Sequence, residues 1–120
     1  MIKTTIKDNI IINTISSEAT LPEVFMYIAN HIDVWKDRHI IWNMNDFIFN
    51  DETTETFRQF IMKGEDISEK RKGLKTAIVV RSDLGYGMMR MFSMLAEGRL
   101  QFSLQTFRNL AEAKKWLLNK

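Results

Sequence analysis

The strongest constraint on the fold comes from the segment Lys75–Arg81, in which four apolar residues, Ala77–Val80, follow one another without interruption. A short apolar run of this kind, with polar residues on both sides, is typical of a parallel strand that helices cover on both faces. We therefore place this strand in the interior of a sheet and interpret the rest of the chain around it.

Strand and helix patterns alternate along the remainder of the sequence. Alternating or continuous β-forming residues predict further strands at about residues 2–6, 10–15, 39–44 and 100–105. Apolar residues at helical spacing predict helices at about residues 21–35, 51–71, 84–97 and 110–117. The order ββαβαβαβα, with the first strand antiparallel to the second, predicts an α/β fold. We expect one domain, residues 1–120, with a mixed, mostly parallel sheet flanked by helices.

The charged residues argue against a nucleic-acid partner. The chain has 17 Lys and Arg against 15 Asp and Glu, for a net charge of +2, and the two signs are interspersed. Nucleic-acid-binding proteins usually gather their basic residues on one face. The densest basic stretch is Lys70–Lys72 with Lys75, which we interpret as a solvated helix end and loop, with a phosphate-binding patch as the alternative.

Composition also limits the compartment and the chemistry. The sequence contains no Cys, so it offers no disulfide, thiolate metal site or Cys nucleophile. No apolar run approaches the roughly 18 residues that a membrane span needs, and the first residues lack the apolar core of a signal peptide. We therefore expect a soluble, cytoplasmic protein without a transmembrane segment.

The titratable side chains form no recognisable catalytic set. His31 and His39 are the only imidazoles and do not have metal-ligand spacing, so we expect no metal and no other cofactor. A cluster of Asp46, Asp51 and Asp83 at the carboxyl end of the sheet is the one basis for an enzyme, but loop carboxylates more often serve as caps and turns. The expected protein is not an enzyme.

Two segments resemble a known family. Val79–Phe92, and the pattern Phe-Arg-x-x-x-Glu-Ala-x-x-Trp-Leu within Thr106–Leu117, are similar to the small bacterial STAS-like proteins grouped near the SEC14 lipid-binding fold. The predicted element order agrees with that family over nearly the whole chain. The resemblance implies a STAS-like fold, and STAS domains are mostly protein-interaction modules whose best known members are switched by phosphorylation.

The family's switch motif, Asp-Ser-Ser-Gly, has a partial counterpart at Asp51–Thr54. On that register Asp51 matches the Asp and Thr53 stands at the phosphoacceptor position, whereas Glu52 replaces the first Ser and Thr54 replaces the Gly. The resemblance thus implies a switch or partner loop here. The alternative interpretation makes Asp51 the N-cap of a helix, with Thr53 and Thr54 in its first turn.

A second candidate loop follows the central strand. Ser82 and Asp83, with Gly85, Tyr86 and Gly87, open a helix, so their backbone N–H groups are placed to face an anion or ligand at the end of the sheet. The glycines are equally consistent with tight packing of the helix against the sheet.

The helix that this loop opens is rich in Met and carries more apolar residues than one buried face requires. The set comprises Met88, Met91, Phe92, Met94 and Leu95. Met suits irregular cores and adaptable binding surfaces. The open alternatives are ordinary core, a homodimer interface, or the wall of an apolar ligand pocket.

These observations leave two functional hypotheses. The first is a non-enzymatic, STAS-like interaction or regulatory module of unknown pathway, whose partner is an unknown protein or a second copy of the chain. The second is a binder or carrier of a small apolar or lipid-like ligand, held in a SEC14-like pocket between the Met-rich helix and the sheet.

Overall fold

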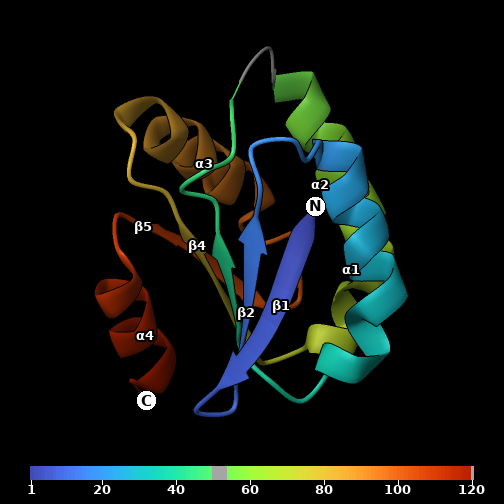
Figure 1. Ribbon diagram of the computed structural model, residues 1–120. Helices are drawn as coiled ribbons and strands as arrows, with labels where there is room; N and C mark the ends of the chain where they lie inside the picture. The colour runs from blue at the N-terminus through green and yellow to red at the C-terminus, as the bar shows by residue number, and fades with distance from the viewer. Residues whose placement is uncertain (50–53, 120) are drawn as a thin grey trace.

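A computed structural model describes residues 1–49 and 54–119 and shows an α/β protein built on one five-stranded sheet (Figure 1). The strands lie side by side in chain order, with β1 antiparallel to β2 and all other neighbours parallel. The predicted fold class and element order are confirmed. The strands are β1 (Ile2–Lys7), β2 (Ile10–Ile15), β3 (Ile40–Asn43), β4 (Lys75–Val79) and β5 (Ser103–Phe107).

Helices connect the parallel strands. In the described part of the chain they are α1 (Leu21–Trp35), α2 (Thr54–Ser68), a short 3-10 helix η1 (Glu69–Arg71), α3 (Asp83–Ala96) and α4 (Leu110–Leu118). Of these, none is long and apolar enough to cross a membrane.

The helices form two unequal layers. Crossovers between parallel strands have one hand, so a sheet whose strands follow chain order carries its crossover helices on one face. Accordingly α1, α2 and α3 lie on one side of the sheet and α4 alone on the other (Figure 1). The larger core therefore lies between the sheet and three helices, and the candidate site lies in this layer.

Strand β4 shows how the two layers arise. Its residues are almost all buried, as the interior-strand prediction requires. Ala77 and Val79 belong to the core cluster under α4, whereas Ile78 and the following Val80 belong to the cluster under the three helices. The apolar run is continuous because both faces of the strand are covered.

Local signals mark several element ends. The side-chain oxygens of Thr20, Ser82 and Asn109 accept hydrogen bonds from backbone N–H groups three residues on, at 3.3, 3.0 and 2.9 Å. Asp8 and Asn9 adopt positive φ values of 54° and 63° in the β1–β2 turn, which suits a two-residue hairpin.

The last strand begins later than predicted. The alternation of Leu100, Phe102 and Leu104 suggested a strand at 100–105, but β5 starts at Ser103 and ends at Phe107. Leu100 and Phe102 instead lie in the connection from α3, where both side chains line the cavity described below. They alternate because they contribute to the same buried layer, although the backbone there is not in the sheet.

Candidate functional site

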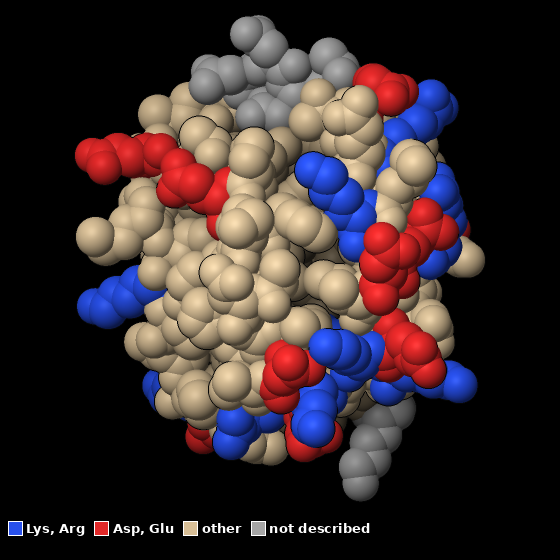
Figure 2. Space-filling view, turned by 90° about the vertical axis from the view of Figure 1, so that its right-hand side faces the viewer, with Lys and Arg blue, Asp and Glu red and all other residues tan. Residues whose placement is uncertain are grey.

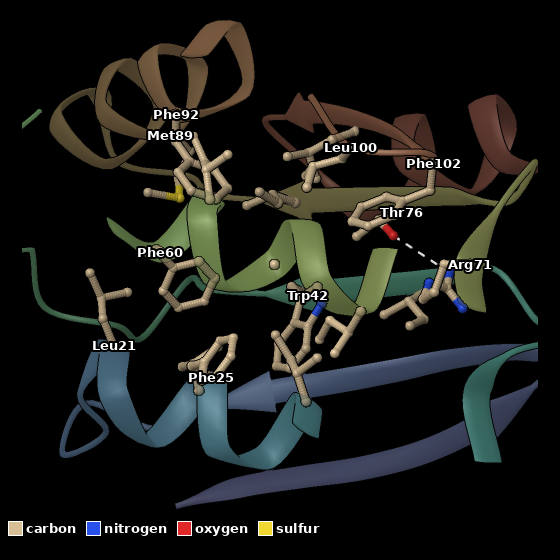
Figure 3. Close-up of a pocket in the computed structure, with 18 of the residues that line it drawn as sticks. Leu21, Phe25, Trp42, Phe60, Arg71, Thr76, Met89, Phe92, Leu100 and Phe102 are labelled. Carbon is tan, nitrogen blue, oxygen red and sulfur yellow. Dashed lines mark hydrogen bonds between the residues drawn. The ribbon is translucent and has the colours of Figure 1, made fainter. Parts of the chain in front are cut away.

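An apolar cavity of about 120 Å³ lies between the sheet and helices α1, α2 and α3. Figure 3 shows side chains from these helices, the sheet and the connection before β5 turned toward this space. Its wall is almost entirely aliphatic, aromatic and thioether groups. They include Leu21, Phe25, Trp42, Phe60, Met89, Phe92 and Leu100.

Aromatic side chains and one glycine surround the cavity where the helices meet. Phe60 on α2 meets Phe25 of α1 and Phe92 of α3 edge-on, with ring centroids 5.7 and 5.8 Å apart. Gly64, one turn further along α2, also lines the cavity, and a Cβ added there would meet only Leu100, at 3.6 Å. A larger side chain at Gly64 would occupy the space that the glycine leaves.

The outer face of α1 and α2 is divided by charge. Figure 2 shows charged side chains gathered on the α2 side, whereas much of the α1 side is uncharged, with a narrow recess near the middle of the face. Lys63 of α2 lies over the Phe25 ring of α1 at 5.5 Å, and Lys70 forms an exposed ion pair with Asp33 at 2.8 Å. These contacts join α1 to α2 and to the following η1.

One end of the cavity is polar. Arg71 and Thr76 contribute its only cationic and hydroxyl side chains, and they are 2% and 5% exposed. Arg71 Nη1 donates to the backbone carbonyl oxygens of Trp35 and Arg38, each at 2.7 Å, and so caps the carboxyl end of α1. Burial lowers the pKa of Arg71 to about 10, so the guanidinium stays charged at neutral pH.

The sequence-based interpretation of the basic stretch is therefore wrong at one position. Lys70 and Lys72 are exposed, as expected for a solvated helix end, but Arg71 is buried. The carbonyl groups that bury it come from the end of another helix, more than thirty residues away in the chain. A pattern confined to residues 69–75 could not reveal this.

His39 lies beside this polar end and its titration should affect stability. Its Nδ1 accepts a hydrogen bond from the Lys75 backbone N–H at 2.9 Å. Burial, and then the charges of Lys75 and Arg71, lower its pKa below the ordinary value of 6.5. Between the folded pKa and 6.5 the unfolded chain binds more protons, so the free energy of unfolding rises with pH in that window.

We therefore expect the contribution of His39 to be complete above about pH 6.5 and lost as the pH falls through its folded pKa. Melting temperatures of wild type and His39→Phe, measured from pH 7.5 to 5, check this. The melting temperature of the wild type should fall more steeply with acidification, because only the wild type contains the His39 imidazole. The other groups titrate alike in both proteins. Parallel curves would contradict the assignment.

The predicted switch loop cannot be placed. Of its four residues, Asp51, Glu52 and Thr53 lie outside the described residues. Thr54 begins α2 and is half-buried, and its hydroxyl lies 3.9 Å from the sulfur of Met91 on α3. The phosphorylation hypothesis for Thr53 stays a prediction.

The loop before α3 has most of its polar groups engaged within the chain. The Ser82 hydroxyl accepts the Gly85 N–H, and Asp83 forms an ion pair with Arg108 at 2.6 Å. A Cβ at Gly85 would lie 2.4 Å from Val80 Cγ1, whereas at Gly87 it would meet nothing within 4 Å. Gly85 thus serves close packing of α3 against the sheet, and Tyr86 stacks under Arg108 at 4.8 Å.

The Met-rich helix is divided between core and surface. Met88, Met91, Phe92 and Leu95 are partly buried and pack against the larger core, whereas Met94 is 67% exposed. Helix α3 needs a wide apolar face because it packs both on the sheet and on α2. Phe92 alone contributes to the cavity from the predicted set.

The remaining candidates do not converge. In the ranges 1–49 and 54–119 no three His, Asp or Glu side chains are grouped to hold a metal ion. Asp51 of the suggested carboxylate cluster lies outside the described residues, and neither Asp46 nor Asp83 lines the cavity. His31 stacks between Tyr27 and Trp35, at 4.1 and 5.3 Å.

A second hollow, of about 880 Å³, runs along the outer side of β5. Its lining is more polar than that of the cavity and includes exposed side chains of α3, of the residue after it and of β5, among them Arg90, Met94, Glu97, Ser103 and Gln105. Because these side chains already face water, this hollow offers less apolar burial to a ligand than the cavity does.

Comparison of the chain with protein-family models, with curated proteins and with solved structures finds no match. The structure shows an α/β protein with an apolar, partly open cavity between its sheet and three helices. Sequence reasoning included such a pocket among its alternatives but missed Arg71, Thr76 and Gly64. The isolated glycine inside a helical pattern was the one local signal that pointed to a special packing position.

Proposed function

We propose that the chain is a non-enzymatic carrier or sensor of a small apolar ligand, held between the sheet and helices α1–α3. The observation that carries this proposal is the cavity of about 120 Å³ with its apolar wall. Apolar cavities of about 150 Å³ stay dry and bind benzene or xenon. An apolar group close to the size of benzene therefore suits this site.

Packing energetics support the proposal. Fully enclosed space that side chains do not fill costs about 24 cal/mol per Å³, so about 3 kcal/mol is the upper bound for this partly open cavity. Small domains are stable by only about 5–15 kcal/mol. Gly64 adds about 0.5–1 kcal/mol, because glycine inside a helix is less stable than alanine. A cavity retained at such cost is consistent with a ligand site.

The interaction-module hypothesis rests on the element order, on the partial switch motif at Asp51–Thr54 and on the absence of a recognisable catalytic set. Most of that motif lies outside the described residues, and the hypothesis stays a prediction. The resemblance to proteins near the SEC14 lipid-binding fold adds support for a ligand site, at the level of fold analogy only. The cavity is the more specific observation, so ligand binding is the function we put to the test.

Benzene binding tests the proposal, with substitutions at Gly64 as matched controls. We expect benzene to shift the methyl NMR signals of cavity-lining residues and to raise the melting temperature of wild type. At ten times Kd the gain in unfolding free energy should be about 1.4 kcal/mol. Gly64→Leu, which fills the cavity, should abolish both effects, and Gly64→Ala, whose Cβ makes only ordinary contact, should retain them.

Gly64→Ala should also stabilise the protein by up to about 1 kcal/mol, since its helical backbone accepts alanine. A wild-type protein whose lining signals do not move with benzene up to saturation would contradict the proposed function. Equal benzene binding by the Leu variant would show that the ligand occupies a different site.

A further inference from the structure

Arg71 is a buried cation without an anionic partner. The three ion pairs within the described ranges join Lys70 to Asp33, Arg99 to Glu65 and Arg108 to Asp83, and all lie at the surface. Arg71, by contrast, is 2% exposed, and its hydrogen bonds within the described residues go to carbonyl and hydroxyl oxygens. Buried charges are normally paired with an opposite charge, so this arrangement is unusual.

The three guanidinium nitrogens of Arg71 differ in their hydrogen bonding. Nη1 makes two short bonds, at 2.7 Å, to the end of α1. Nη2 makes only two long contacts, at 3.5 Å, to the Lys75 carbonyl and the Thr76 hydroxyl. Nε is buried and has no hydrogen-bond partner. The Nε–Nη2 edge therefore retains donor capacity.

Arg71 lies in the wall of the cavity, next to Thr76. Thr76 lines the cavity, and Figure 3 draws the contact between its hydroxyl and Arg71 at the end of the space opposite Leu21 and Phe25. The Phe102 ring, also in the wall, lies 5.9 Å from the guanidinium carbon. The site thus combines an apolar body with one cationic end. The neighbouring Lys75 and His39 carry no negative charge that could neutralise Arg71.

We propose that the ligand of this cavity is a small amphipathic carboxylate, which inserts its apolar part among the helices and pairs its carboxylate with the Nε–Nη2 edge of Arg71. The proposal rests on the proposed function, whose ligand class it specifies. Two parallel N–H donors match the two oxygens of a planar carboxylate. The Thr76 hydroxyl is placed to donate to the same group.

Three probes with the same six-carbon chain test the ligand class on the wild-type protein: hexanoate, 1-hexanol and hexylamine, titrated at about pH 8 where hexanoate is ionised. We expect hexanoate to bind at least about tenfold more tightly than 1-hexanol, and hexylamine more weakly than both. In NMR spectra the Arg71 Nε–H signal should move with hexanoate and stay in place with 1-hexanol.

Arg71→Lys provides the matched variant, because it keeps the positive charge and loses the two-donor edge. It should bind 1-hexanol as wild type does and lose most of the preference for hexanoate. Hexanoate binding no tighter than 1-hexanol in wild type would overturn the carboxylate inference and leave the apolar cavity proposal intact. Failure of all three probes and of benzene to bind wild type would overturn the proposed function itself. Both results come from wild type, so they hold even if the variant does not fold.

Discussion

Replacing Gly85 by alanine should lower the free energy of unfolding by about 2–3 kcal/mol, the range expected for an overpacked core. The new Cβ would lie 2.4 Å from Val80 Cγ1, 2.6 Å from Phe49 Cε2 and 2.8 Å from Ser82 Oγ. Val80 is 1% exposed on the sheet and cannot retreat, so helix α3 would have to move. For a chain of this length the melting temperature should fall by roughly 10 °C.

Gly87→Ala is the matched control, two residues further along the same helix. No atom lies within 4 Å of a Cβ at that position, and the backbone is helical. The control should therefore be neutral or more stable by up to about 1 kcal/mol. Thermal unfolding of both variants measures the difference. Equal stabilities would mean that Gly85 is not a packing position, and would reopen its assignment to an anion-binding loop.

The elements that sequence reasoning placed correctly are those governed by local chemistry. The continuous apolar run of Ala77–Val80 has one simple explanation, a strand covered on both faces, and β4 confirms it. The helices at about residues 21–35 and 84–97 were also placed correctly, and their ends depend on a few neighbouring residues: Thr20 caps α1, and Gly98, with φ of +78°, follows α3. Each of these signals acts within one or two helical turns.

The cavity could not be predicted in this way because it depends on packing among three helices. Its volume is the difference between the space that α1, α2 and α3 enclose and the side chains that they supply. The burial of Arg71 depends similarly on the position of Trp35, the last residue of α1. Helix α3 does carry more apolar residues than one buried face requires. That surplus could not predict the cavity, because the helix divides its apolar surface between the sheet, α2 and the cavity.

The same contacts explain how the polar end of the cavity holds a buried cation. The cation is held by the negative end of the α1 dipole, through the Trp35 and Arg38 carbonyls, and not by a carboxylate of the chain. A carboxylate side chain in that place would satisfy the Nε–Nη2 edge permanently. The two carbonyl groups hold Nη1 of Arg71, and Nε has no hydrogen-bond partner within the described residues.

Arg71→Met should destabilise the protein by about 3 kcal/mol, because it removes two short, charge-assisted hydrogen bonds and leaves the Trp35 and Arg38 carbonyls without them. Relief of the cost of burying a cation works in the opposite direction. We expect the loss to prevail, since the carbonyls at the end of α1 keep their desolvation cost. Denaturant unfolding should show a lower midpoint with an unchanged slope.

Lys70→Met, one residue earlier in η1, is the control for this prediction. Its ion pair with Asp33 has side chains that are 49% and 77% exposed, so water and salt already screen it, and little change is expected. If the Arg71 variant were as stable as this control, the guanidinium would not be the cap that holds the end of α1. We expect instead that Arg71→Met is destabilised and that hexanoate loses its advantage over 1-hexanol in Arg71→Lys. One side chain would then have both roles: Nη1 stabilises the helix end, and the Nε–Nη2 edge selects the ligand.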